Sequence, residues 1–560
     1  MNQTHRVIPR TPHGLSAGII HADPRHYAKN PDFCLLPDGR LLCTFMQGDQ
    51  HVPFDYSRVV LIQSADGGET WTEPRVLAEA RTGIGTWGAA PDVDHEPWLS
   101  PRISRLRDGR LIIVCDKDDH QHAHEGQPSG IYAWWSQDQG STWGGPHLTG
   151  VPGIEPDQVV ELDDGTLLMG THFQVAATQK LGEFVARSRD GGRTWDPVVP
   201  VATDSIHNFC EGAIVQLPSG RLVNVMRENN HHNYPCYLAF SDDRGLTWTK
   251  AVEAPFSGDR PYGGLLSDGR FFVTHADQAG RPVTNAWVGD IEREHGYKVA
   301  IGGRNRGRAT ALGTAPLAGQ ALNAPSVEIG RNQHLVELTP DALRIDNKWE
   351  TPVRYHLLPP DLPSTEVEFE IELRLEGSGG AKLEILVARV GLFLELAPGW
   401  LRLAPQRGGH AWMARRDVDL TRWRTVRALH KGGLVEVFVD GESMARYTHF
   451  REAPWERSYF GTAGDHSGSA YVRRVSYTTR DEGRAHEWTW ESSSGAHPNQ
   501  YEIDRWLTLA LNEEAFPDHG YTTWAELPGG RIVVAETSGA GAPLQKAFIH
   551  AYHVDLAALG

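Results

Sequence analysis

Two hydrophobic patterns divide the chain. The first is a pair of short apolar runs on either side of an Asp-Gly turn or a close relative, as in residues 33–42, and this pattern is typical of a β-hairpin. Six such turns predict six hairpins, at Asp38-Gly39, Asp108-Gly109, Asp164-Gly165, Ser219-Gly220, Asp268-Gly269 and Gly529-Gly530. From about residue 325 to 480 longer strands alternate apolar and polar residues, as in 367–373 and 434–440. That alternation indicates a sheet with one buried and one solvated face.

A second repeat follows the hairpins. The spacing S-x-D-x-G-x-T-W occurs four times, with its aspartates at Asp66, Asp138, Asp190 and Asp243. An Asp at this place can accept hydrogen bonds from the backbone N–H groups that follow it, and the Gly permits a positive φ. Successive copies lie roughly fifty residues apart after a longer first interval, which an extended loop at 78–98 explains. A period near ~50 residues with four strand-like segments predicts propeller blades or a related array.

This motif resembles the Asp box of sialidase-type β-propellers. A fifth unit at 262–290 has a hairpin but no box, and the propeller pattern returns at 520–527. A last blade completed by an N-terminal strand near 6–9 would close the ring. The predicted fold is therefore all-β, a six-bladed β-propeller with an inserted β-sandwich (jelly-roll) that resembles laminin-G or concanavalin-like domains. The predicted domains are blades one to five at 1–325, the sandwich at 326–482 between the fifth and sixth blades, and blade six at 483–560.

Composition narrows the classes of function. A formal net charge of −17 argues against non-specific binding to nucleic acid or anionic membranes. The N-terminal residues lack the apolar core of a signal peptide, and no apolar run approaches membrane-spanning length. Five cysteines without a C-x-x-C pair are typical of reduced core thiols, so we expect a cytoplasmic protein. No phosphate loop, dinucleotide fingerprint, serine nucleophile elbow or nucleic-acid module is present.

Blade geometry predicts where a site would lie. Strand 1 starts and strand 2 ends share one face, and the boxes lie on the opposite face, so we expect the box aspartates to be structural. Polar residues recur at strand 1 starts, namely Asp32, His95, Glu96, Glu155, Asp157, His207, Glu211, Arg260, Tyr262, His519 and Tyr521. They also recur at strand 2 ends, namely Gln47, Asp49, Asp116, Lys117, Asp118, His172, Arg227, Glu228, His275, Asp277 and Glu536. Their recurrence in all six units favours a common site over unrelated loop residues.

Three positions match the sialidase pattern. Tyr521 stands in Gly-Tyr-Thr-Thr where sialidases carry their Tyr-Ser nucleophile motif, Glu211 stands where they carry the activating Glu, and Arg227 resembles one arginine of their carboxylate-binding triad. A phenol with an ordinary pKa near ~10 needs a carboxylate to take its proton before it can attack at neutral pH. A guanidinium binds a substrate carboxylate as a bidentate fork. The resemblance implies an exo-acting glycoside hydrolase.

The remaining roles follow the pattern less closely. Asp55 best fits the place of the acid/base, which protonates the leaving oxygen and then activates water, and Asp49 is second. Sialidases carry Arg-Ile-Pro at the start of the first blade, whereas this chain carries Asn-Pro-Asp-Phe at 30–33. With one arginine of the triad missing, Arg260 and Arg281 are candidates for another, and the sugar is an acidic or even neutral glycoside. Further predicted substrate contacts are Asp32, which would bind hydroxyl groups, Glu96, His172 and His275.

Other classes of function stay open. A His-Tyr or His-Arg pair in the funnel could abstract the proton beside a uronate carboxylate, which would make the protein a polysaccharide lyase. A propeller can also bind glycans without catalysis. We expect no cofactor, with the alternating His120, His122 and His124 the candidates for a metal. The expected partner is a carbohydrate substrate, and the sandwich is a spacer, a wall of the site or a homo-oligomer contact.

Overall fold

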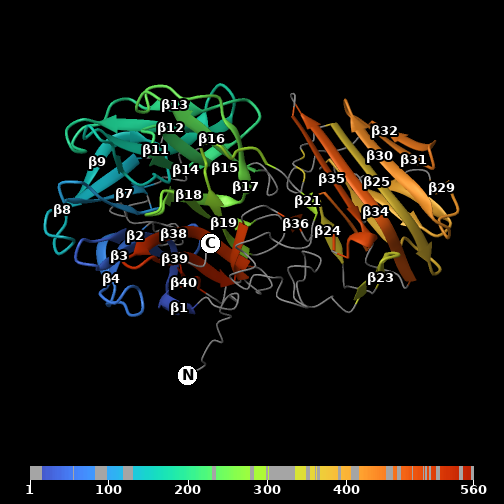
Figure 1. Ribbon diagram of the computed structural model, residues 1–560, viewed down its shortest axis with the longest axis horizontal. Helices are drawn as coiled ribbons and strands as arrows, with labels where there is room; N and C mark the ends of the chain where they lie inside the picture. The colour runs from blue at the N-terminus through green and yellow to red at the C-terminus, as the bar shows by residue number, and fades with distance from the viewer. Residues whose placement is uncertain are drawn as a thin grey trace, which may run out of the picture.

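The computed structural model describes residues 16–53, 56–81, 97–117, 130–229, 235–277, 283–297, 300–301, 335–347, 353–357, 359, 361, 366–388, 393–404, 415–448, 458–462, 468–481, 484–495, 497–498, 501–502, 506–511, 517–540 and 546–555. These residues form an all-β protein in two lobes (Figure 1). Within them there is no α-helix, and one 3₁₀ turn, η4, spans Ser492–Ser494. The described part of the chain therefore holds no helix with the length and apolar character of a membrane span.

One lobe consists of four-stranded antiparallel sheets, each written here from its inner to its outer strand. The first three are β2 (Tyr27–Leu35), β3 (Leu41–Gly48), β4 (Tyr56–Ser64) and β5 (Arg75–Arg81); β6 (Arg102–Arg105), β7 (Leu111–Lys117), β8 (Gly130–Ser136) and β9 (Gly144–Pro152); and β10 (Val160–Glu161), β11 (Leu167–Val175), β12 (Lys180–Ser188) and β13 (Val199–Ala202). The next three are β14 (Phe209–Gln216), β15 (Leu222–Glu228), β16 (Pro235–Ser241) and β17 (Val252–Ser257); β18 (Asp259–Leu265), β19 (Phe271–Asp277), β20 (Val283–Gly289) and β37 (Trp506–Leu511); and β38 (Pro517–Leu527), β39 (Arg531–Ala540), β40 (Phe548–Asp555) and β1 (Ser16–His21).

All six predicted hairpins are present, each joining the inner two strands of one sheet. Two connections differ from the sequence prediction. The outer strand of the sixth sheet is β1, whereas the expected strand at 6–9 lies outside the described residues. The fifth sheet takes its outer strand from β37, so the long insertion separates the third and fourth strands of that sheet instead of following a completed unit.

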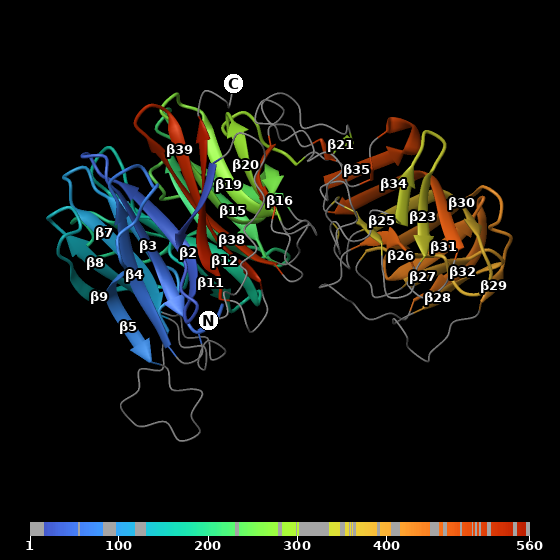
Figure 2. The ribbon, with the colours of Figure 1, turned by 90° about the horizontal axis from the view of Figure 1, so that it is seen from below.

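The inner strands of successive sheets are hydrogen-bonded or ion-paired in cyclic order. Five of these links are hydrogen bonds, donated by Ile103 N to Asp32 Oδ2 (2.7 Å), Val159 N to Ser104 Oγ (2.9 Å), Ile214 N to Asp157 Oδ2 (2.5 Å), Trp524 Nε1 to Tyr262 O (3.1 Å) and Phe33 N to Thr523 Oγ1 (3.1 Å). The fourth and fifth sheets are linked by an ion pair, in which Arg227 Nε on the second strand β15 lies 2.9 Å from Asp259 Oδ1 on β18. Apolar cores fill the space between neighbouring sheets, with Leu41, Val60 and Val533 in one such core. Figure 2 shows these sheets side by side in one lobe.

The four motif turns have the geometry expected from their residues. In the fourth, Asp243 Oδ1 accepts from Thr247 N at 2.8 Å and from Ser241 Oγ at 2.8 Å, and Gly245 has φ 79°. Three of these turns also touch the hairpin turn of an adjacent sheet, for example through Arg244 Nη1 and Asp164 Oδ2 at 2.5 Å. The motif turns and the hairpin turns therefore lie at the same edge of the lobe, as the strand order predicts.

The second lobe is made of longer strands in two larger sheets. The eight-stranded sheet contains β22 (Val336–Leu338), β23 (Leu343–Asn347), β34 (Gly468–Asp481), β25 (Glu366–Glu376), β30 (Arg424–Lys431), β31 (Leu434–Val439), β32 (Glu442–Tyr447) and β35 (Arg484–Glu491). The six-stranded sheet contains β24 (Arg354–His356), β33 (Tyr459–Gly461), β26 (Leu383–Leu386), β27 (Phe393–Ala397), β28 (Trp400–Ala404) and β29 (Arg416–Asp417). A two-stranded ribbon joins β21 (Ala300–Ile301) to β36 (Tyr501–Glu502).

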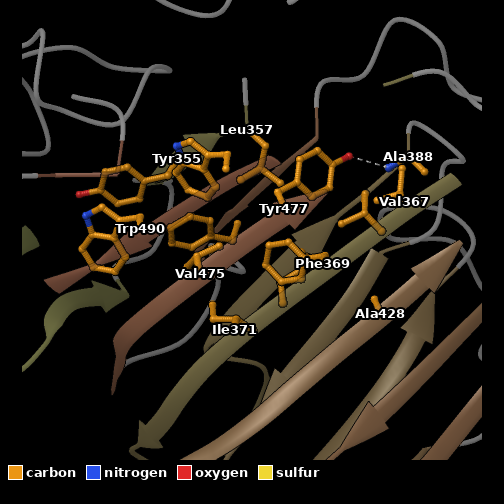
Figure 3. Packing of buried hydrophobic residues seen from close by; sticks show 14 of the residues in the cluster. Tyr355, Leu357, Val367, Phe369, Ile371, Ala388, Ala428, Val475, Tyr477 and Trp490 are labelled. Carbon is orange, nitrogen blue, oxygen red and sulfur yellow. Dashed lines mark hydrogen bonds between the residues drawn. The ribbon is translucent and has the colours of Figure 1, made fainter. Parts of the chain in front are cut away.

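The core of this lobe explains the alternating sequence pattern. Along β25 buried and partly exposed residues alternate, with Val367, Phe369 and Ile371 in the core. Figure 3 shows these side chains against Tyr477 and Trp490, and Ala388 N donates to Tyr477 Oη at 3.4 Å. The two lobes meet where His486 Nε2 lies 2.9 Å from Glu253 Oε1 of β17. All five cysteines are buried and free, as predicted.

Candidate functional site

The innermost strand of every four-stranded sheet carries a two-residue bulge near its start. The pairing of β14 with β15 jumps from Cys210↔Arg227 to Ala213↔Val225, and equivalent jumps occur in β2, β18 and β38. In the second and third sheets, the backbone hydrogen bonds on either side of the bulge likewise leave two residues of the inner segment opposite one residue of the neighbouring strand. Such bulges re-aim a side chain and are over-represented beside active sites. The first bulge residues are Asn30, Ser100, Glu155, Glu211, Arg260 and Tyr521.

Five of these six residues have a positive φ although none is glycine. The values are 57° for Asn30, 46° for Glu155, 50° for Glu211, 41° for Arg260 and 51° for Tyr521. Each such residue costs roughly 1 kcal/mol or more of backbone strain, and strained residues of this kind cluster at active sites and ligand clamps. Glycine would adopt these five conformations without strain, so the side chains present there are candidates for the functional site.

Hydrogen bonds and ion pairs connect the bulge residues across the lobe. Asn30 Nδ2 donates to Ser100 Oγ at 2.6 Å, and Arg260 Nη1 reaches the same hydroxyl at 3.5 Å. Arg260 Nη1 also donates to Glu155 Oε2 at 3.0 Å, and its guanidinium carbon lies 5.2 Å from the centre of the Tyr521 ring. Side chains from five sheets that are distant in sequence therefore meet at one place.

Tyr521 is surrounded by charged and aromatic groups. Lys29 Nζ lies 5.5 Å from its ring centre, and the ring of His51 is 5.9 Å away. Burial raises the pKa of Tyr521 well above its usual value, and the carboxylates of Glu211 and Glu155 raise it further. Burial also lowers the pKa of His51 to about 4 and lowers that of Lys29. The phenol therefore stays protonated at neutral pH unless a nearby base takes its proton.

Glu211 is one of the two carboxyl groups whose charge raises the pKa of Tyr521. Arg227 Nη1 donates to both of its carboxylate oxygens, at 2.9 and 3.0 Å, and Arg227 Nε lies 2.9 Å from Asp259 Oδ1. The backbone N–H of Glu211 donates to His172 Nδ1 at 3.2 Å, so the neutral His172 ring carries its proton on Nε2. Burial raises the pKa of Glu211 to about 7 against the pull of Arg227, and lowers that of His172 to about 4.

Asp32 does not face this site. Its side chain is fully buried, and its oxygens accept hydrogen bonds from Gln158, Tyr262, Thr523 and the N–H of Ile103 at 2.7–3.1 Å. The guanidinium of Arg102 lies 3.6 Å away. We expected Asp32 to bind substrate hydroxyl groups, but protein donors already occupy its carboxylate. Asp32 ties four inner strands together beneath the bulges.

The other predicted site residues are placed as follows. His275 is fully buried and stacks on Phe256 of β17 with ring centres 5.4 Å apart, so it belongs to the packing between the fourth and fifth sheets. Arg227, Arg260 and His172 join the bulge residues, as described above. The predicted Asp55, Glu96, Arg281, His120, His122 and His124 lie outside the described residues. In the part that is described, no group of three or more His, Cys, Asp or Glu residues could hold a metal ion.

Residues 57–282 match the family model of the BNR repeat-like domain. All four S-x-D-x-G-x-T-W motifs lie inside this segment. No curated protein matches the chain. This segment contains Glu155, Glu211, Arg227 and Arg260, whereas Tyr521 lies beyond it.

Several solved structures resemble the chain at low sequence identity. A protein of unknown function from Dyadobacter fermentans is 16% identical, covering 82% of this chain and 100% of its own, with a TM-score of 0.42. A Hadza microbial sialidase is 17% identical, covering 47% of this chain and 56% of its own, with a TM-score of 0.38. The Trypanosoma rangeli sialidase in complex with sialic acid is 12% identical, covering 88% and 97%, with a TM-score of 0.37.

Sequence reasoning missed Lys29, His51, Ser100 and Asp259, and did not distinguish Glu155 from its polar neighbours. A signal was available. Five bulge residues stand nine positions before the last glycine of their hairpin turn, and Glu155 stands ten before Gly165. In four of the six, proline follows the bulge residue. Proline is tolerated there because the extra residue of a bulge donates no ladder hydrogen bond.

Proposed function

We propose that the six four-stranded sheets are the blades of a six-bladed β-propeller and that the two larger sheets form an inserted β-sandwich. The cyclic contacts between inner strands support the first part, since only a closed ring returns the sixth sheet to the first. The insert, predicted at 326–482, then extends through β35 (Arg484–Glu491), which pairs with β34 in the eight-stranded sheet. The propeller comprises residues 1–325 and the part of the chain after the insert, with β37 completing the fifth blade. The bulge residues surround the axis of this ring at the end opposite the Asp boxes.

At that end the protein acts, in this proposal, as an exo-acting glycoside hydrolase of the sialidase-like type. The observation that carries the proposal is the position of Tyr521 and Glu211 on equivalent strained bulges, with the Glu211 carboxylate acting on the pKa of Tyr521. A buried phenol next to a carboxyl group with a pKa of about 7 is a nucleophile with its own base.

The reaction would proceed in two steps. Glu211 takes the Tyr521 proton as the phenol oxygen attacks the anomeric carbon, and Asp55 protonates the departing glycosidic oxygen. Asp55 then removes a proton from water, which attacks the same carbon and releases Tyr521, and Glu211 returns the proton to the phenolate. Two displacements at one carbon retain its configuration. A neutral nucleophile such as a phenol suits an anionic sugar because it avoids charge repulsion.

The substrate we propose is a terminal acidic sugar. Lys29, Arg227 and Arg260 bring three cationic groups to the surroundings of Tyr521. Arginine binds carboxylates through parallel N–H donors, which fixes orientation as well as charge. The glycoside would lie over the Tyr521 ring with its carboxylate toward this cluster.

A product assay tests the proposal. The full chain is incubated with a panel of aryl glycosides of acidic and neutral sugars and with uronate oligosaccharides, and release of the aryl group is followed beside the absorbance near ~235 nm. Hydrolysis releases the aryl alcohol without that absorbance, whereas elimination beside a carboxylate creates a conjugated double bond. An increase in that absorbance would show elimination, and the protein would then be a lyase instead of a hydrolase. Glycan binding without turnover of any substrate would show that the propeller binds glycans without catalysis.

A further inference from the structure

Glu155 interacts with two parts of the site, one that contains Arg260 and one that contains Glu211 and Arg227. Its Oε2 accepts a hydrogen bond from Arg260 Nη1 at 3.0 Å, and Arg260 packs its guanidinium over the Tyr521 ring at 5.2 Å. Glu155 also interacts electrostatically with Glu211, whose carboxylate is held by Arg227. The two glutamates occupy equivalent bulges of the third and fourth sheets, with φ of 46° and 50°.

We infer that Glu155 is a positioning residue that holds Arg260 against the Tyr521 ring and accepts the hydrogen bond of the Glu211 proton, and thereby sets the pH above which Glu211 becomes a base. This inference rests on the proposed function, because it describes how the Tyr521–Glu211 pair is prepared for the reaction. Glu155 is not required to touch the substrate. Its effect is transmitted through Arg260 and Glu211.

The charges around the two glutamates separate their behaviour. Glu155 faces Arg260, Lys29 and His172 as well as Glu211, and although burial opposes it, Arg260 and Lys29 hold the pKa of Glu155 well below its usual value. Glu211 faces Arg227, Glu155, Arg260 and Asp259, and burial raises its pKa to about 7. At a mildly acidic pH the pair therefore holds one proton, on Glu211. Carboxyl pairs with opposite shifts are typical of acid/base sites.

The consequence is a pH threshold. Below about pH 7 Glu211 carries its proton, donates it in a hydrogen bond to Glu155 and cannot accept the proton of Tyr521. Above that pH Glu211 is ionised and works as a base. Removing the Glu155 charge removes a repulsion that favours the protonated form of Glu211, so the threshold must move to lower pH. It also removes the partner that orients Arg260.

The experiment compares Glu155→Gln with the wild type in two ways. The kcat/KM for a cleaved aryl glycoside is measured from pH 4 to 10, and the side-chain carboxyl of Glu211 is titrated by ¹³C NMR, with its resonance assigned from Glu211→Gln. We expect the acidic limb of the profile and the Glu211 titration to fall together by roughly one pH unit or more, which is the size of a charge–charge effect at close range. Glu161→Gln is the control. It removes one charge from the same segment of the third sheet but away from the Tyr521 ring, so the pH profile and the Glu211 titration should both stay unchanged.

The two measurements separate the two hypotheses. If Glu211 titrates lower in Glu155→Gln but no glycoside is cleaved by any form, the inference stands and the proposed function fails. If glycosides are cleaved and neither the profile nor the titration moves, the inference is wrong. Should Glu155→Gln fail to fold, the wild type decides alone, because a single Glu211 titration near its ordinary value of ~4.3 would overturn the inference. Glu155→Asp, which keeps the charge, should restore most of the threshold.

Discussion

A single guanidinium nitrogen of Arg227 donates to both carboxylate oxygens of Glu211, at 2.9 and 3.0 Å, while Nε of the same group lies 2.9 Å from Asp259. Arg227 thus joins the fourth and fifth sheets and stabilises the ionised form of Glu211. Burial and the Glu155 charge act in the opposite direction. The proton affinity of Glu211 is therefore a balance between two neighbours of opposite charge, and each can be removed separately.

Replacing Arg227 by Gln removes the favourable side of that balance. We expect the pKa of Glu211 to rise above about 7, so the acidic limb of kcat/KM should move to higher pH, opposite to the shift expected for Glu155→Gln. If Arg227 also binds the sugar carboxylate, KM for an acidic aryl glycoside should rise at least ~10-fold. Arg189→Gln, an exposed arginine on the motif edge, serves as the control. A profile shifted to lower pH would contradict the assignment.

Replacing Tyr521 by Phe tests the nucleophile with little change in shape. The ring that lies beneath Lys29 and Arg260 is kept, and only the hydroxyl is lost. Because the covalent route depends on that oxygen, we expect kcat to fall by about 10³-fold or more while glycan affinity and melting temperature stay close to those of the wild type. Tyr132→Phe in β8 is the matched control. Full activity in Tyr521→Phe would exclude the proposed nucleophile.

Replacing Asp32 by Asn distinguishes a structural from a substrate-binding role. Whichever way the new amide is turned, its N–H₂ group would face protein donors, namely Ile103 N and Gln158 Nε2 at the Oδ2 position or Gln158 Nε2, Tyr262 Oη and Thr523 Oγ1 at the Oδ1 position. We expect a loss of about 2–4 kcal/mol in the free energy of unfolding, measured by chemical denaturation. The exposed Asp163→Asn should change it by less than ~0.5 kcal/mol. A stable variant with a raised KM would restore the original expectation that Asp32 binds sugar hydroxyls.

The parts of the fold that sequence predicts are those determined locally. Each hairpin turn and each motif turn is fixed by residues within a few positions of one another, such as Ser241, Asp243 and Thr247, so its pattern is visible in the chain. The position of the insertion is not local. β20 ends at Gly289 and its partner β37 begins at Trp506, and nothing in the apolar run 506–511 names that partner.

The site divides in the same way. Tyr521, Glu211 and Arg227 could be chosen as candidates because their surrounding motifs resemble the sialidase pattern. Lys29 and Asp259 could not, because their proximity to those residues depends on how six sheets are arranged. The burial of Asp32 was also hidden, since its partners Tyr262 and Thr523 come from strands far along the chain. A charged residue at a strand start looks the same whether it faces a ligand or a neighbouring strand.

Replacing Asp243 by Ala tests the assignment of the motif turns to the structural edge. Burial works against it, but hydrogen bonds from Thr247 hold the pKa of Asp243 below its usual value. The stabilisation is therefore present above the unfolded pKa of ~3.9 and is lost as the pH falls through the lower folded value. We expect a lower melting temperature at pH 7, a difference that shrinks in acid, and an unchanged kcat. A large fall in kcat with an unchanged melting temperature would show that residues at the edge of the motif turns take part in the reaction.

Replacing Glu536 by Gln tests a buried acid that the reaction does not use. Its side chain is 1% exposed, accepts a hydrogen bond from Thr284 Oγ1 and lies opposite His550 in the strand register. Burial raises the pKa of Glu536 to about 8, so the folded state holds this proton more tightly than the unfolded state does. The contribution of Glu536 to the free energy of unfolding is complete below its unfolded pKa of ~4.3. It is lost as the pH rises from there through the folded pKa of about 8, at about 1.4 kcal/mol per pH unit.

Gln has the shape and neutrality of the protonated acid and can still accept from Thr284. The stability of Glu536→Gln relative to the wild type should therefore increase steadily from pH 5 to pH 8 in denaturant titrations. Glu526→Gln in β38 is the control and should show no such trend. A pH-independent difference would mean that Glu536 is ionised in the folded protein, and the buried partner that stabilises its charge would then have to be sought near Thr284.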